Sequence, residues 1–149
     1  MVESDSLVEI LLVEDNPSDV ELTLHAFERH NLSNHVHVIR DGEEALDFLF
    51  CRGIYSGREM ARPPKVVLLD LKLPKVSGLE VLKEVKSDPR TRPIPIVVLT
   101  SSRQERDLVD SYELGANSYI VKPVDFDRFT DAVSKLGLYW LLVNQVPWS

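Results

Sequence analysis

The sequence is poor in cysteine, has no long apolar run and carries no surplus of positive charge. Cys51 is its single cysteine, so no disulfide can form within the chain, and we expect a cytoplasmic protein. No apolar run approaches the roughly 20 residues of a membrane-spanning helix, and the acidic start Met1–Asp5 does not resemble a signal peptide. The 17 basic residues are outnumbered by 24 acidic ones, which argues against general nucleic-acid binding. The sequence therefore predicts a small cytoplasmic domain with neither a nucleic acid nor a membrane as its partner.

What the sequence does contain is a regular alternation of two patterns. Its 149 residues, 44% hydrophobic and 28% charged, have the composition of one globular domain. Short apolar runs rich in β-branched residues predict strands at residues 8–13, 36–39, 66–69, 96–99 and 118–121. Three of these runs are continuously apolar, as in strands buried on both faces, whereas the alternating second run suits a strand nearer an edge.

Helix signals lie between the apolar runs. They are Asn16 followed by Pro17, Asp41 with Glu44 at capping-box spacing, Gly78, Ser102 with Gly115 closing its helix after Leu114 in a left-handed conformation, and Asp125. Five βα units in succession predict a doubly wound, five-stranded parallel α/β sheet with helices on both faces.

One predicted connection, residues 52–65, is much longer than the about 2–6 residues usual in α/β units. It contains Arg52, Arg58, Arg62 and Lys65 around Glu59. A solvated loop is the simpler interpretation of this basic segment. The alternative is a surface that docks a partner or attracts phosphate.

Polar residues follow the predicted strands where those strands end. Glu14 and Asp15 follow the first strand, Asp70 the third, Thr100 the fourth and Lys122 the fifth. Parallel strands bring their carboxyl ends to one edge of the sheet, where open α/β folds bind ligands. The sequence therefore predicts that three carboxylates, a hydroxyl and an ammonium meet at one site.

Such a site needs a cation, because two carboxylates about 4 Å apart repel by about 4 kcal/mol at an effective dielectric near 20. Oxygen ligands favour Mg²⁺, Mn²⁺ or Ca²⁺ over zinc, and Mg²⁺ commonly shares its coordination with a phosphate oxygen. A carboxylate such as Asp70 can itself attack a phosphoryl group and form an aspartyl-phosphate. The predicted chemistry is therefore phosphoryl transfer.

The order and spacing of these residues resemble those of the CheY-like receiver domains of two-component response regulators. The matching motifs run from LLVEDN at residues 11–16 through LLD at 68–70, with Pro74 and Gly78 after it, to VLTSS at 98–102, Gly115-Ala116, Tyr119 and Lys122-Pro123. The resemblance covers essentially the whole chain. It implies a flavodoxin-like sheet with strand order 2-1-3-4-5, and a signalling receiver, not an enzyme, whose chemistry is limited to self-phosphorylation and autodephosphorylation.

The resemblance also implies a role for each site residue. Asp70 is implied to accept the phosphoryl group, with Mg²⁺ (or Mn²⁺) as the cofactor. The other implied roles are Asp15 and the backbone carbonyl of Lys72 as metal ligands beside Asp70, Glu14 acting through a metal-bound water, Lys122 contacting the phosphoryl group, Thr100 and Tyr119 as the switch pair, and a cis peptide bond before Pro123. An aromatic residue on a strand usually packs, so we also expect Tyr119 to lie partly in the core.

A narrower resemblance concerns the response regulators paired with bacterial and cyanobacterial phytochromes. These proteins share the long connection after the second helix, the string LGANSYI at residues 114–120 and a tail like LYWL at 138–141. The implied partner is a sensor histidine kinase of the phytochrome type. We expect a single receiver domain over residues 1–149, with a core at about 7–136, an apolar extension at 137–149 and no output domain.

The tail is unusually apolar for a terminal helix. Six consecutive apolar residues exceed one core-facing stripe, so some of them are expected to face solvent in a monomer. We therefore predict a homodimer through the last helix and tail, centred on Leu138, Tyr139, Trp140 and Leu141. Extra packing within the domain is the alternative.

Two other functional classes fit the sequence less well. A phosphatase of the haloacid-dehalogenase type has a second Asp two residues after its nucleophile, and Lys72 stands at that position. A flavodoxin-like cofactor binder needs a phosphate-binding loop after the first strand, where Glu14 and Asp15 would repel phosphate. The sequence therefore favours a phosphorylation-dependent switch.

Overall fold

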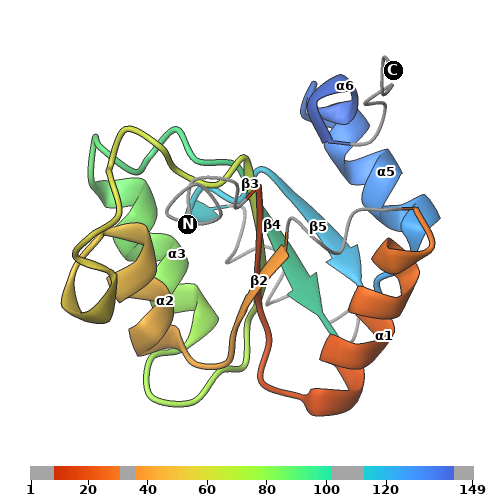
Figure 1. Ribbon diagram of the computed structural model, residues 1–149, viewed down its shortest axis with the longest axis horizontal. Helices are drawn as coiled ribbons and strands as arrows, with labels where there is room; N and C mark the ends of the chain where they lie inside the picture. Colours follow the sequence, from red (N-terminus) through yellow and green to blue (C-terminus); the bar gives the residue numbers. More distant parts are fainter. Residues whose placement is uncertain (1–8, 31–35, 102–112, 143–149) are drawn as a thin grey trace.

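The computed structural model describes residues 9–30, 36–101 and 113–142, which form a five-stranded parallel sheet between helices (Figure 1). The strand order is β2-β1-β3-β4-β5, and every neighbouring pair is parallel. The predicted flavodoxin-like topology is therefore confirmed. The strands are β1 (Ile10–Val13), β2 (Val36–Ile39), β3 (Val66–Asp70), β4 (Ile96–Thr100) and β5 (Ser118–Val121).

Burial follows strand position as the hydrophobic pattern predicts. The continuously apolar strands β1, β3 and β4 are buried along their whole length in the middle of the sheet, and the alternating β2 lies at an edge. β3 and β4 each run one residue further than predicted, so Asp70 and Thr100 are the last residues of their strands. Both polar side chains are therefore held on regular strand backbone.

Helices cover both faces of the sheet. α1 (Pro17–Glu28) and α5 (Phe126–Lys135) lie on one side, and α2 (Gly42–Leu49) and α3 (Gly78–Ser87) lie on the other (Figure 1). Two shorter pieces, η3 (Gly53–Tyr55) and α6 (Tyr139–Leu142), follow α2 and α5. The helix predicted from Ser102 to Leu114 lies outside the described residues except at its end, where Gly115 has a φ of +101°.

The core consists of two apolar clusters separated by the sheet, because alternate strand residues point to opposite faces. One cluster joins the sheet to α2 and α3, and the other joins it to α1 and α5. In the second cluster the rings of Phe27 and Phe129 pack with their centroids 4.6 Å apart. Each helix pair therefore packs against its own set of strand side chains.

Polar side chains cap the four long described helices as local sequence favours. Asn16, Asp41, Ser77 and Asp125 each accept a hydrogen bond from the backbone N–H three residues later. Ser77, and not Gly78, caps α3. Gly78 is needed for packing, since a Cβ there would lie 2.1 Å from the carbonyl oxygen of Asp70.

The long connection at residues 52–65 is fastened to α2. The Tyr55 hydroxyl donates a hydrogen bond to Glu44 Oε2 at 2.5 Å, so the Glu44 carboxylate binds the connection as well as standing at capping-box spacing from Asp41. Arg58 donates to the carbonyl oxygen of Phe48 at 2.6 Å, and its guanidinium lies 3.7 Å from the centroid of the Phe48 ring. These contacts explain how a segment with little regular structure remains ordered.

Part of the apolar tail belongs to the core. Leu142 is buried, and Leu138 packs against the cluster between the sheet and α1 and α5. Leu141 is 48% exposed and Tyr139 is half-buried. The side chain of Trp140 and residues 143–149 lie outside the described part of the chain. Among the described helices, none has the length and apolar character needed to cross a membrane.

Candidate functional site

Three of the predicted site residues meet at the carboxyl edge of the sheet. The Nζ atom of Lys122 lies 3.0 Å from Glu14 Oε1 and 3.5 Å from Asp70 Oδ2. All three side chains are largely buried. The structure therefore brings together residues that are 108 positions apart in the chain, with one ammonium facing two carboxylates.

Strand alternation explains why these side chains share one face. Leu12 and Leu68 pack in the cluster under α1 and α5, and Glu14 and Asp70 each come two residues later on their strands. Ile120 belongs to the same cluster, and Lys122 follows it by the same interval. The residue after β1, the last residue of β3 and the residue after β5 thus direct their polar side chains to the face that carries α1.

A third carboxylate, which the sequence did not single out, completes the group. Asp19 in the first turn of α1 places its Oδ2 atom 3.0 Å from Lys122 Nζ. The only feature of the sequence that links Asp19 to this site is its position five residues after Glu14, on the helix that follows β1. That signal is weak, because an acidic residue in a first helical turn is ordinarily explained by the helix dipole.

The electrostatics of the site are not balanced. Burial, together with the charge of Asp70, raises the pKa of Glu14 from 4.5 to about 7, even though a backbone N–H and Lys122 oppose the shift. Burial alone would lower the pKa of Lys122, but its hydrogen bonds to Asp19 and Glu14 and the charge of Asp70 outweigh burial and raise it. Lys122 is therefore held as a cation among more negative charge than it can neutralise.

The donor set fits a magnesium-type cation. Asp15 is exposed next to Glu14, and Lys72 is exposed two residues beyond Asp70. Over the described residues, no three His, Cys, Asp or Glu side chains gather as a metal-binding group. Mg²⁺ needs only about one or two carboxylates, since carbonyl oxygens and waters fill its remaining positions. Burial is the main cause of the raised pKa of Glu14, and such a cation would offset the Asp70 charge that adds to it.

The two predicted switch residues lie on the other face of the sheet. Thr100 is two residues beyond Val98, which packs in the cluster under α2 and α3, and Tyr119 is paired with Val98 in the β4–β5 register. Thr100 is buried. Tyr119 is 40% exposed and is in neither core cluster of the described residues, so the expectation that it lies partly in the core is not confirmed. The Lys122–Pro123 peptide bond is cis, as the resemblance implies.

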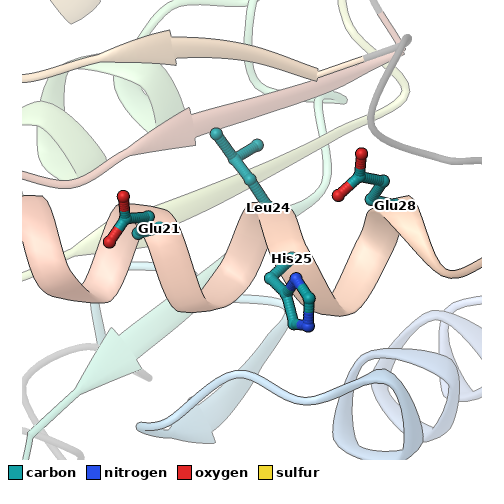
Figure 2. Close-up of a pocket in the computed structure, with 4 residues that line it drawn as sticks. All are labelled: Glu21, Leu24, His25 and Glu28. Carbon is teal, nitrogen blue, oxygen red and sulfur yellow. The ribbon is translucent and has the colours of Figure 1, made fainter.

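A separate pocket lies on α1, away from the carboxyl edge. It has a volume of about 300 Å³ and is lined by Glu21, Leu24, His25 and Glu28, none of which contacts Lys122 or Asp70 (Figure 2). Figure 2 shows Glu21, Leu24 and Glu28 projecting to one side of the helix and His25 to the other. The charged cluster and the pocket are therefore distinct features.

Known proteins resemble this chain over almost its whole length. The family model described as the response regulator receiver domain matches residues 10–134. The probable methanogenesis regulatory protein FilR2 of Methanothrix harundinacea is 42% identical over 147 residues, which cover 99% of this chain and 92% of that protein.

Two solved structures are close in both fold and sequence. The bacteriophytochrome response regulator AtBRR is 58% identical, with a TM-score of 0.81, over 92% of this chain and 97% of that one. The Mn²⁺-bound form of the response regulator Rcp1 is 35% identical, with a TM-score of 0.72, over 94% of this chain and 97% of that one.

Proposed function

The chain belongs to the response regulator receiver domain family, and we propose that it is a phosphorylation-dependent switch that accepts a phosphoryl group on Asp70. The observation that carries this proposal is the buried meeting of Asp70, Glu14 and Lys122 at the carboxyl edge. Asp70 is the last residue of β3, and among the described residues Lys122 is the only cation of the group that its side chain faces. A phosphoryl group bound to Asp70 would lie beside the Lys122 ammonium.

The chemistry assigned to the chain's own residues is simple. A carboxylate oxygen of Asp70 attacks phosphorus, and the bond between phosphorus and the donor atom breaks in the same displacement. Lys122 balances charge on the phosphoryl oxygens, and Thr100 supplies a hydroxyl donor. Asp15, Asp70 and the backbone carbonyl of Lys72 would hold Mg²⁺ or Mn²⁺, with Glu14 reaching it through water. The bound cation supplies charge neutralisation.

Intact mass spectrometry after incubation with acetyl phosphate and Mg²⁺ tests the assignment. The wild-type protein is expected to gain one acid-labile phosphoryl group, and Asp70→Asn to gain none. Asp88→Asn is the matched control, because Asp88 is also an aspartate of the same chain but lies at the far end of α3, where it pairs with Arg90. An adduct on Asp70→Asn at wild-type yield contradicts the proposal.

We assign the phosphodonor to a sensor histidine kinase of the phytochrome type. The support is the 58% identity to a bacteriophytochrome response regulator over nearly the full length of both chains. Phosphotransfer profiling against purified kinases tests this pairing. A phytochrome kinase is expected to transfer its phosphoryl group faster than kinases of other classes, and equal rates across classes contradict the assignment.

We propose that Thr100 and Tyr119 transmit phosphorylation of Asp70 to the face of the sheet opposite Lys122. A Thr100 hydroxyl drawn toward the phosphoryl group vacates space beside the partly exposed ring of Tyr119, which shifts a two-state equilibrium. Thr100→Ala is expected to take up phosphate but to lose phosphorylation-dependent changes in partner binding. Retention of those changes at the wild-type level contradicts this role.

Self-association through the tail remains a proposal, with Leu138, Tyr139, Trp140 and Leu141 as its candidate residues. The exposed Leu141 supports it, whereas buried Leu142 shows that the tail also contributes to the core. Leu141→Ser is therefore a better test than truncation, because it alters the exposed side chain. Sedimentation at several concentrations is expected to show a weaker dimer than wild type, and an unchanged dimer contradicts the assignment.

A further inference from the structure

Asp19 lies against Lys122 but takes no part in the phosphoryl transfer proposed above. Its Oδ2 atom is 3.0 Å from Lys122 Nζ, the same distance as Glu14 Oε1, whereas Asp70 Oδ2 is 3.5 Å away. The ammonium therefore donates hydrogen bonds to Glu14 and Asp19 and is displaced from the phosphoacceptor toward α1. A residue that draws Lys122 away from Asp70 affects what Asp70 can bind.

The two carboxylates that accept hydrogen bonds from Lys122 differ in burial and in their other hydrogen-bond partners. Glu14 is 1% exposed, and its other oxygen, Oε2, accepts a hydrogen bond from the Asn16 backbone N–H at 3.1 Å. Asp19 is 29% exposed, and among the described residues Lys122 is the one side chain bonded to its carboxylate. Water can replace the ammonium at Asp19 far more easily than at Glu14. The contact with Asp19 is therefore the one that can be released.

We propose that Asp19 is a positioning residue that competes with the phosphoryl group for Lys122. This inference rests on the proposed function of Asp70. A phosphoryl group adds a charge of about −1.5 to −2 and new acceptor oxygens beside the ammonium. Lys122 keeps its contact with Glu14 and transfers the N–H that binds Asp19 to a phosphoryl oxygen. Asp19 thereby weakens the hold on the phosphoryl group and shortens its lifetime.

A purely structural role for Asp19 makes a different prediction. A carboxylate in the first turn of a helix stabilises that helix through its dipole, and loss of that effect lowers folding stability without changing anion binding. The competition predicts tighter anion binding when the negative charge is removed. Affinity for a phosphoryl mimic therefore distinguishes the two roles, and melting temperature alone does not.

The test compares Asp19→Asn, Asp19→Glu and Glu21→Gln with the wild type. Glu21→Gln is the matched control, because it removes one negative charge from an exposed position on the same helix without touching Lys122. Calorimetric titration with beryllofluoride in excess Mg²⁺ gives the affinity for the mimic, and intact mass against time gives the half-life of the phosphorylated protein. Asp19→Asn is expected to raise both by about fivefold, the scale of a partly exposed charge pair. Asp19→Glu, which keeps the charge, and Glu21→Gln are expected to stay within about twofold of wild type.

A second measurement needs neither metal nor phosphoryl group. In metal-free protein, a double-mutant cycle between Asp19→Asn and Lys122→Met is expected to show coupling that shifts the folding equilibrium by about threefold. Additive effects in the cycle, or affinity and half-life for Asp19→Asn equal to those of Glu21→Gln, overturn the competition. Failure of the wild-type protein to be phosphorylated at Asp70 would instead overturn the proposed function, so the two failures are distinguishable.

Discussion

Two regions of the molecule surround their carboxylates in different ways. At the carboxyl edge, Lys122 faces Glu14, Asp19 and Asp70, and burial together with the charge of Asp70 raises the pKa of Glu14 to about 7. On α2 and the long connection after it, Glu44 accepts a hydrogen bond from the neutral Tyr55 hydroxyl and Asp47 pairs with the Arg52 guanidinium. Three carboxylates share one ammonium in the first region, whereas these two carboxylates each have a donor of their own.

This difference indicates which region responds to a ligand. A cluster with excess negative charge changes its energy when a cation or a phosphoryl group arrives, because each addition alters the balance around Lys122. The clasp, defined as His37, Glu44, Phe48, Tyr55 and Arg58, gains nothing from such an addition. Burial and the bond to Glu44 raise the pKa of Tyr55, so this hydroxyl stays protonated across the ordinary pH range. The clasp is therefore a structural feature, and three substitutions test the contrast.

The largest effect is expected from Phe48→Ala in the clasp. Phe48 is fully buried, and its ring contacts His37, Tyr55 and Arg58. Removing it is expected to lower the free energy of unfolding by about 3–5 kcal/mol, measured by urea denaturation. The folded fraction is expected to keep its rate of phosphorylation from acetyl phosphate. A phosphorylation rate more than about twofold below wild type would show that the clasp and the site around Lys122 are energetically coupled. Substitutions at distant, independent sites act additively, so no such loss is expected. Phe48→Leu, which leaves a smaller cavity, is the milder control.

An intermediate effect, dependent on pH, is expected from Glu14→Gln at the carboxyl edge. The folded protein raises the pKa of Glu14 from 4.5 to about 7, so it binds that proton more tightly than the unfolded chain does. The contribution of Glu14 to stability is therefore complete below pH 4.5 and is lost as the pH rises toward 7. In metal-free protein at pH 8, Glu14→Gln is expected to increase the free energy of unfolding by about 2 kcal/mol.

The control for this prediction is the same substitution at an exposed position. Glu21→Gln is expected to leave the pH dependence of unfolding unchanged, since Glu21 is exposed on α1. Addition of Mg²⁺ is expected to reduce the advantage of Glu14→Gln, because a cation offsets the charge that destabilises Glu14. An advantage that is equal at pH 5 and pH 8 would show that the charge of Glu14 is not its source.

The smallest effect is expected from Tyr55→Phe. This substitution removes the hydroxyl that donates to Glu44 and leaves the ring against Phe48 in place. The free energy of unfolding is expected to fall by about 1 kcal/mol, with no change in phosphoryl half-life. The loss is expected to be small because water can solvate Glu44 when the hydroxyl is absent. A fall in the free energy of unfolding as large as that of Phe48→Ala would mean that the hydrogen bond, and not ring packing, holds residues 52–65 against α2.

The local parts of this structure were predictable because their causes are local. Apolar runs placed all five strands, and Asn16, Asp41 and Asp125 cap helices where the spacing predicts. The positions of Asp70 and Lys122 at strand ends were equally clear. By contrast, the sequence does not predict the hydrogen bond between Tyr55 and Glu44. Local spacing carries no information on the path that residues 52–65 take past α2.

The sequence by itself determined the order of the strands along the chain, their burial, three of the four helix caps and the set of reactive residue types at one edge. These follow from side-chain volume, polarity and spacing of only a few residues. The tertiary structure alone decided that Asp19 shares Lys122 across 103 positions, that Tyr119 is 40% exposed, and that Leu142 turns into the core. Such outcomes depend on where separate elements meet in space, because the energies of buried charge and packing are set by neighbours that are remote in the chain.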